Sequence, residues 1–196
     1  SENFTWSSAF NITLPGNKLL RFDNLQGSSY ANTYVVGEPL FISKRFGSQG
    51  VDPTTGHYQF TDFDGDGKIS APNDQQLIVF TGQQYFGGFQ NTMTWKQFSF
   101  SFLLQFVRNR FAPTYLTLFG KPGSFSNQPS LVVDRWTKPG DEASIQRYSY
   151  SNSGANSAFN RYRQSDAAFS DASFVRMRNL FISYTIPKIT KKDYLR

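Results

Sequence analysis

The chain has 196 residues, which is enough for a single good core, and its formal net charge is +6. It has no cysteine, so disulfide scaffolds and thiolate metal sites are excluded. Its 21 Phe and 10 Tyr, with only 17% charged residues, predict an all-β fold. The basic residues are scattered and accompany no recognition helix or RNA-binding signature, so we expect no nucleic-acid partner.

Alternating apolar and polar residues predict the first strands. Residues 4–13 alternate, with Phe4 and Trp6 on one parity, and read as a strand. A tight turn at residues 15–17 leads into a return strand, expected over residues 18–26. A long segment rich in Gly, Pro, Asn and Ser then covers residues 27–82.

Two further strands, over residues 83–95 and 98–108, are expected to form an antiparallel hairpin through Lys96 and Gln97. The second strand has one apolar parity, formed by Phe98, Phe100, Phe102, Leu104 and Phe106. A period of two places these side chains on one face and polar ones on the other. The apolar face would meet a second sheet in a soluble sandwich or lipid in a transmembrane barrel, and periodicity alone leaves both open.

The rest of the chain favours the barrel. Residues 109–173 are again long, irregular and polar, and a last strand is expected over residues 174–186, with a parity change near Asn179 that predicts a bulge. Structureless loops of this length are unusual in a compact soluble domain. Short periplasmic turns that alternate with long extracellular loops are typical of outer-membrane barrels. We therefore predict a partial antiparallel transmembrane β-barrel in which the segments 27–82 and 109–173 are extracellular.

Aromatic residues on these strands are expected to face lipid or to form interfacial girdles. The predicted lipid-facing and girdle residues are Trp6, Tyr85, Trp95, Phe98, Phe100, Phe102, Phe106 and Tyr184. On this interpretation the lumen-facing residues of the hairpin are Ser99, Ser101 and Gln105. The alternative for the aromatic residues is packing in a sandwich core.

An acidic glycine turn over residues 62–70 has the spacing of a calcium loop. The expected ligands are Asp62, Asp64, Asp66, the backbone carbonyl of Lys68, and Asp74. Position twelve of the loop is Asn73 rather than a bidentate Glu, and Asp74 lies one residue late. Bound Ca²⁺ would stiffen an outer loop; the alternative is an Asx/Gly turn that binds nothing.

We expect no catalytic residues and no enzymatic activity. His57 is the only histidine, so a multi-histidine metal site cannot form, and no nucleophile-elbow motif surrounds it. The acidic pairs lie in turns rather than in a placed cleft. The sequence does not identify a substrate-binding residue.

Six stretches, in order along the chain, resemble the SusC/RagA-like TonB-dependent outer-membrane transporters of Bacteroidetes. They are residues 4–12 (FTWSSAFNI), 36–40 (VGEPL), 62–69 (DFDGDGKI), 85–92 (YFGGFQNT), 134–137 (DRWT) and 173–180 (SFVRMRNL), the last running on to 184–187 (YTIP). The resemblance implies the C-terminal part of a barrel of about 22 strands, the class of large plugged transporters. The plug, the segment that contacts TonB and the last strands would lie outside this sequence.

The resemblance also implies a function and a location. It implies TonB-driven import of glycan or peptide fragments across the bacterial outer membrane, together with a SusD-like surface lipoprotein that acts as a lid. The alternative is a soluble extracellular β-sandwich that binds carbohydrate, with calcium bracing a loop.

Overall fold

The computed structural model describes residues 4–109, 112–151 and 153–187. The chain divides into two compact units. The first comprises residues 1–15, 83–109 and 173–196, and the second comprises residues 16–82 and 110–172.

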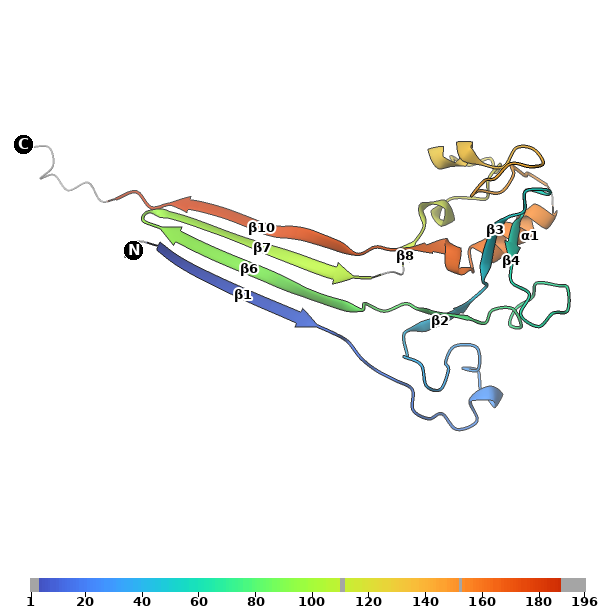
Figure 1. Ribbon diagram of the computed structural model, residues 1–196, viewed down its shortest axis with the longest axis horizontal. Coiled ribbons are helices and arrows are strands. Elements are labelled where there is room, and N and C mark those ends of the chain that lie inside the picture. Colours follow the sequence, from blue (N-terminus) through green and yellow to red (C-terminus); the bar gives the residue numbers. More distant parts are fainter. Residues whose placement is uncertain (1–3, 110–111, 152, 188–196) are drawn as a thin grey trace, which may run out of the picture. The chain divides into compact units, whose positions relative to one another are not determined.

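The first unit is a four-stranded antiparallel sheet, whose strands are the long arrows of Figure 1. The strands are β1 (Phe4–Thr13), β6 (Tyr85–Trp95), β7 (Phe98–Arg108) and β10 (Phe174–Tyr184). They lie in the order β1-β6-β7-β10, and every neighbouring pair is antiparallel. All four lie where alternation of apolar and polar residues placed a strand.

A two-residue connection, Lys96 and Gln97, joins β6 to β7. Trp95 pairs with Phe98 across it, and Lys96 has a φ of 54°. Tight hairpin turns need this left-handed backbone because its twist matches that of the flanking strands. The carbonyl of Gln97 also accepts a hydrogen bond of 2.8 Å from the Thr185 N–H, which ties the turn to the end of β10.

The register gathers the apolar side chains of all four strands on one face of the sheet. Residues directly opposite each other in an antiparallel pair share a face. Phe10 opposes Phe89, Phe89 opposes Leu104, and Leu104 opposes Met177. Aromatic rings pack along this face, with centroid distances of 5.7 Å for Phe10–Phe106, 6.3 Å for Phe89–Phe102 and 5.7 Å for Phe100–Phe102.

This apolar face is exposed in the described part of the chain. Trp6 is 64%, Phe10 62% and Ile182 67% exposed. In a β-sandwich the corresponding face would be buried against a second sheet. No described strand covers this face as the second sheet of a sandwich would, and an uncovered apolar side is what a barrel wall requires.

Strand β10 contains the bulge that its parity change predicted. Its register against β7 shifts between Met177, which opposes Leu104, and Asn179, which opposes Leu103. Arg178 is the extra residue. Because one residue is inserted, the apolar side chains before and after the bulge stay on the same face.

The strand expected over residues 18–26 is absent. Residues 18–22 are not in a strand, and Leu25–Gly27 forms a short 3-10 helix. Asn24 precedes it with a left-handed φ of 53°, which ends any extended run. The backbone N–H and C=O of Leu19 bond instead to Glu38 and Gly37, at 2.9 and 2.8 Å. The backbone N–H and C=O of Leu19 therefore form hydrogen bonds within a loop rather than with a neighbouring strand.

The second unit is built from short elements. Its strands form three two-stranded sheets: β2 (Ile42–Arg45) with β5 (Leu77–Phe80), β3 (Ser48–Val51) with β4 (Tyr58–Phe60), and β8 (Ala112–Pro113) with β9 (Phe169–Ser170). Its helices are α1 (Ser153–Tyr162) and the 3-10 turns Leu25–Gly27, Tyr115–Leu118, Ser130–Asp134 and Asp166–Ala168. Among the described residues no helix is both long and apolar enough to cross a membrane.

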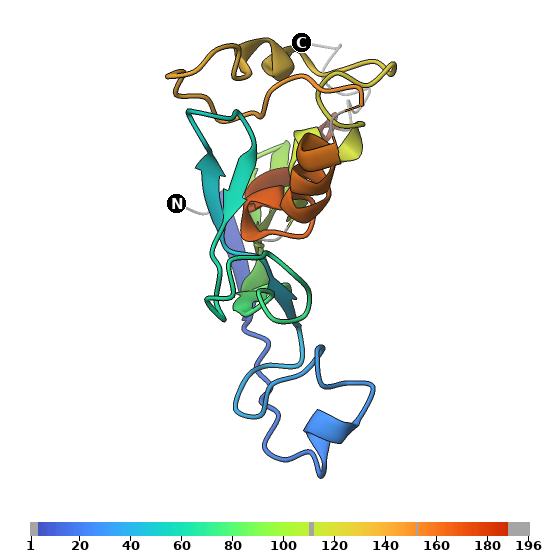
Figure 2. The ribbon, with the colours of Figure 1, turned by 90° about the vertical axis from the view of Figure 1, so that its right-hand side faces the viewer.

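A hydrophobic core holds the second unit together, so the two long segments are not structureless. Its buried residues are Phe46, Tyr58, Phe60, Leu116, Val132, Ile145, Ala158, Phe159 and Tyr162. Tyr58 of β4 stacks on Tyr162 of α1 with ring centroids 4.3 Å apart. Figure 2 shows α1 beside β3 and β4, elements about a hundred residues earlier in the chain. The predicted loops 27–82 and 109–173 thus fold as one unit, whose bounds begin at residue 16.

Candidate functional site

The predicted lipid-facing and girdle residues all lie on the apolar face of the four-stranded sheet. The residues concerned are Trp6, Tyr85, Trp95, Phe98, Phe100, Phe102, Phe106 and Tyr184. Phe98, for example, opposes both Trp95 and Tyr184, and Phe102 opposes Leu180. The three residues predicted for the lumen, Ser99, Ser101 and Gln105, lie on the opposite face.

Aromatic residues mark the two ends of this face. At the hairpin end, Phe4, Trp95, Phe98 and Tyr184 form one row across all four strands. The rings of Phe98 and Tyr184 lie 4.7 Å apart. At the other end Tyr85 opposes Arg108, and its ring lies 6.4 Å from that of Phe106. With about 3.3 Å per residue, the rows at Trp95 and Tyr85 are roughly 33 Å apart along the strand, close to the span of a bilayer core when strands tilt.

Asn91 is a polar residue on the apolar face, where it opposes Ser8 of β1. It opposes Phe102 and is 2% exposed. Its Oδ1 accepts a hydrogen bond of 2.9 Å from Nε1 of Trp6. Each of the two polar groups thus partly satisfies the other, which lowers the penalty for placing them on an apolar surface.

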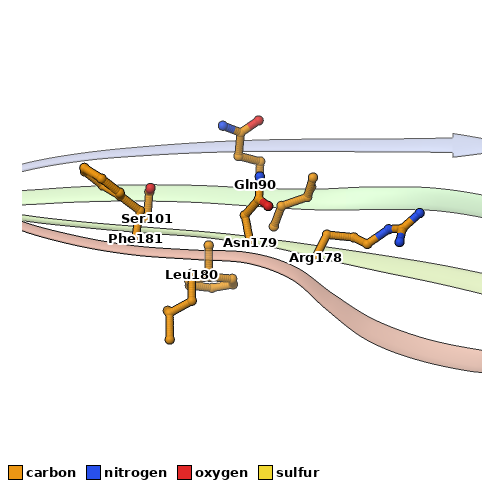
Figure 3. Close-up of a pocket in the computed structure, with 8 residues that line it drawn as sticks. Gln90, Ser101, Arg178, Asn179, Leu180 and Phe181 are labelled. Carbon is orange, nitrogen blue, oxygen red and sulfur yellow. The ribbon is translucent and has the colours of Figure 1, made fainter.

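A groove at the β10 bulge, shown in Figure 3, has lining residues from both faces of the sheet. The groove has a volume of about 540 Å³ and is lined by Gln90, Ser101, Phe102, Leu103, Arg178, Asn179, Leu180 and Phe181. In Figure 3 the side chains of Gln90 and Arg178 extend to one side of the sheet, and Leu180 extends to the other. Ser101 was predicted from the sequence to face the lumen, whereas Arg178 was not predicted to lie in a site. The parity change near Asn179 could have drawn attention to Arg178, because it marks the bulge.

The acidic loop of the second unit brings three of the predicted calcium ligands together. Carboxylate oxygens of Asp62, Asp64 and Asp74 all lie within 4.8 Å of one another. Asp74, which lies one residue past the expected position, therefore reaches the cluster. Asp66 lies outside this group, and its carboxylate accepts a hydrogen bond of 2.7 Å from the Lys68 N–H.

Backbone N–H groups hold the carboxylates of this loop in place. Asp62 accepts from Gly67 and Gly65, each at 2.8 Å. The Gly67 contact is the largest of several hydrogen bonds that lower the pKa of Asp62. Asp74 is fully buried and accepts at 2.7 Å from both Phe63 and Ser70. Three carboxylates in one turn form the hard-oxygen donor set that Ca²⁺ prefers, so these residues fit the ion.

The loop aromatics divide into buried and exposed groups. Trp136, Phe159 and Tyr162 are buried, and Nε1 of Trp136 donates to the carbonyl of Pro53 at 2.9 Å. They stabilise the second unit. Tyr148 and Tyr150 remain 44% and 67% exposed.

Comparison with known proteins identifies the class of fold. No protein-family profile matches the chain. The TonB-dependent receptor P3 of Formosa agariphila is 24% identical over 214 residues, which cover 96% of this chain and 20% of that receptor. The TonB-dependent receptor P39 of the same organism is 31% identical over 130 residues, which cover 64% of this chain and 12% of the receptor.

Solved structures point the same way. The RagAB peptide importer in its "open-open" state matches 95% of this chain and 21% of the solved chain, with a TM-score of 0.69 and 16% identity. This chain matches a barrel portion of SusC/RagA-like TonB-dependent receptors. The "closed-closed" state of the same importer matches with a TM-score of 0.61.

The SusC/RagA-like match confirms the predicted fold class and location. The four-stranded sheet is part of an antiparallel transmembrane β-barrel, and the protein is assigned to the bacterial outer membrane. The chain spans about a fifth of the length of the relatives and solved chains that it matches over nearly its whole length.

Proposed function

We propose that this chain forms part of the wall of an importer that carries nutrients across the outer membrane without enzymatic chemistry. The observation that supports this most strongly is the two-faced sheet, which is apolar and aromatic-edged on one side and polar on the other. The receptor and importer names of the similar proteins agree with it. On this proposal the apolar face contacts lipid, and the face that carries Ser99, Ser101 and Gln105 lines the lumen.

We further propose that the cargo is a glycan or peptide fragment and that a SusD-like lipoprotein covers the barrel. Energy would come from TonB through parts of the protein outside this chain. The support is the solved RagAB complex, which is described as a peptide importer. The exposed Tyr148 and Tyr150 offer flat apolar surface for such contacts in the second unit.

Uptake by whole cells tests the importer. Cells that carry the intact receptor are given a panel of fluorescent oligosaccharides and peptides, and a receptor-deleted strain and receptor-bearing cells with a collapsed proton gradient serve as controls. We expect at least one compound to accumulate only in energised, receptor-bearing cells. Equal accumulation in all three populations would contradict the proposal.

The second unit is proposed to face the outside of the cell, with the Lys96–Gln97 turn in the periplasm. The chain has no cysteine of its own, so single cysteines can report orientation within it. Ser126→Cys should react with a membrane-impermeant maleimide on intact cells, whereas Gln97→Cys should react only after the outer membrane is opened. The reverse pattern would refute this orientation.

Calcium binding by the acidic loop is a separate proposal. Ca²⁺ would bind through Asp62, Asp64 and Asp74 and brace the loop. In the intact receptor, Ca²⁺ should slow hydrogen–deuterium exchange of residues 62–74, and Asp64→Asn should remove the effect. Asp141→Asn, which changes an acidic turn elsewhere, is the matched control.

A further inference from the structure

We propose that Arg178 binds a carboxylate group on the polar face of the sheet. Val175, Met177, Leu180 and Ile182 all lie on the apolar face. Without Arg178 this alternation would be uninterrupted, so the bulge accommodates one added residue, and that residue is a cation. Bulges commonly re-aim a side chain beside a functional site.

The charge balance of the sheet calls for an anion. Residues 4–15, 83–109 and 173–187 contain four basic residues, Lys96, Arg108, Arg176 and Arg178, and no Asp or Glu. Lys96 lies in the hairpin turn and Arg108 at the far end of β7. Arg176 and Arg178 lie two residues apart on β10, and no acidic residue in these segments balances their charge.

Arg178 is available for such a contact. Arg176 already packs its guanidinium over the ring of Phe174, 4.7 Å from the centroid. Arg178 is exposed and has no hydrogen-bond or ion-pair partner among the described residues. Its planar guanidinium can donate two parallel hydrogen bonds to one carboxylate, a geometry that an ammonium group cannot reproduce.

The groove around Arg178 suits a carboxylate carried on a small organic group. Gln90, Ser101 and Asn179, which line the same groove as Arg178, offer amide and hydroxyl donors. Leu103 and Phe181 supply apolar walls. The inference rests on the proposed lumenal position of the polar face of the sheet.

Two sources could supply the carboxylate. One is imported cargo, such as a peptide with a free C-terminus. The other is an acidic residue from elsewhere in the intact receptor, since this chain spans about a fifth of its relatives' length. Both sources would form the same ion pair with Arg178. Only a carboxylate from the protein itself would make Arg178 contribute to the stability of the receptor when no cargo is bound.

The test uses the purified intact receptor with three variants. Arg178→Gln removes the charge, and Arg178→Lys keeps the charge but removes the bidentate geometry. Lys96→Gln makes the same charge change in the hairpin turn and is the control. The thermal midpoint is measured without ligand, and calorimetry measures binding of two probes, N-acetylated tetra-alanine with a free C-terminal carboxylate and the same peptide with an amidated C-terminus.

Two results would support the proposal. If cargo supplies the carboxylate, Arg178→Gln weakens binding of the free-acid peptide about tenfold, Arg178→Lys weakens it less, and the amide is unaffected. If the protein supplies it, Arg178→Gln lowers the thermal midpoint more than Lys96→Gln does, and Arg178→Lys restores part of the loss. The proposal is overturned if both Arg178 variants match Lys96→Gln in both measurements. These readouts do not involve transport, so they stay distinct from the uptake test.

Discussion

Gly87 of β6 leaves room for the backbone of β1 on one side and for the Phe106 ring of β7 on the other. A Cβ atom on Gly87 would lie 2.1 Å from the backbone oxygen of Asn11 and 2.5 Å from Cζ of Phe106. The neighbouring Gly88 has room, because its Cβ would meet nothing closer than Oδ1 of Asn11 at 3.4 Å. Two adjacent glycines therefore have different roles in the same strand.

These glycines give a matched pair of substitutions. Gly87→Ala should destabilise the intact receptor by about 1–3 kcal/mol, since the backbone of β1 must move to relieve the clash. Gly88→Ala should change stability by less than about 1 kcal/mol. Guanidinium unfolding of the receptor in detergent measures both. Equal effects would show that β1 does not approach β6 as described.

His57 should make the second unit sensitive to mild acid. Burial lowers the pKa of His57, and the charge of Arg147 lowers it further, against a smaller opposing effect of Asp52. The folded state thus favours the neutral ring, while the unfolded chain takes up a proton as pH falls below about 6.5. The stabilisation is present above that pH and is lost as pH falls toward the folded-state pKa.

Hydrogen–deuterium exchange of residues 52–60 in the intact receptor checks this expectation. After correction for intrinsic rates, protection should fall between about pH 7 and pH 5. His57→Gln should flatten that dependence. Protection that rises on acidification would mean that the imidazolium is favoured instead.

Charged substitutions can test which side chains of strand β7 contact lipid. Phe102 packs its ring against Phe89 on the apolar face, while Ser101 lies on the opposite face. Phe102→Arg should cost about 2–4 kcal/mol if the site lies near the bilayer midplane. Ser101→Arg should be tolerated because it faces water. Reversible folding into lipid vesicles measures the loss of folding free energy for each variant. Equal losses for Phe102→Arg and Ser101→Arg would contradict the assignment of Phe102 to the lipid face.

Alternation predicted the four long strands because it is a local signal. Phe98 to Phe106 repeat every second residue, and nothing in the fold overrides them. The strand over residues 18–26 was expected from the tight turn before it, and the left-handed Asn24 and the bonds of Leu19 to residues 37 and 38 are not visible in the sequence. A few alternating residues beside a turn are weak grounds for a strand.

The second unit and the groove could not be predicted in the same manner. The stacked rings of Tyr58 and Tyr162 come from residues about a hundred positions apart, so no short sequence pattern predicts their contact. The clustering of Asp62, Asp64 and Asp74 was predictable because these residues lie within one short stretch of the sequence, whereas calcium binding there stays a prediction. Arg178 was missed because its importance appears only when the bulge places it beside Gln90 and Ser101.

Among the described residues of the molecule, the four-stranded sheet has two unpaired edges. Strands β1 and β10 lie at the ends of the strand order, and the chain spans about a fifth of its relatives. Open edges are not tolerated within lipid, because unpaired backbone groups there cost several kcal/mol each. We therefore expect β1 and β10 to pair with strands from the rest of the protein, and the 196-residue fragment alone to aggregate in buffer.

Fluorescence quenching along β7 can test whether one face of the sheet contacts lipid and the other faces the lumen. Single cysteines in this chain would carry an environment-sensitive fluorophore in the intact receptor, reconstituted with lipids that bear a nitroxide quencher on the acyl chain. We expect strong quenching at Phe100→Cys, Phe102→Cys and Leu104→Cys, and weak quenching at Ser99→Cys, Ser101→Cys and Gln105→Cys. Uniform quenching, or none at any position, would contradict a barrel wall with lipid on one face and the lumen on the other.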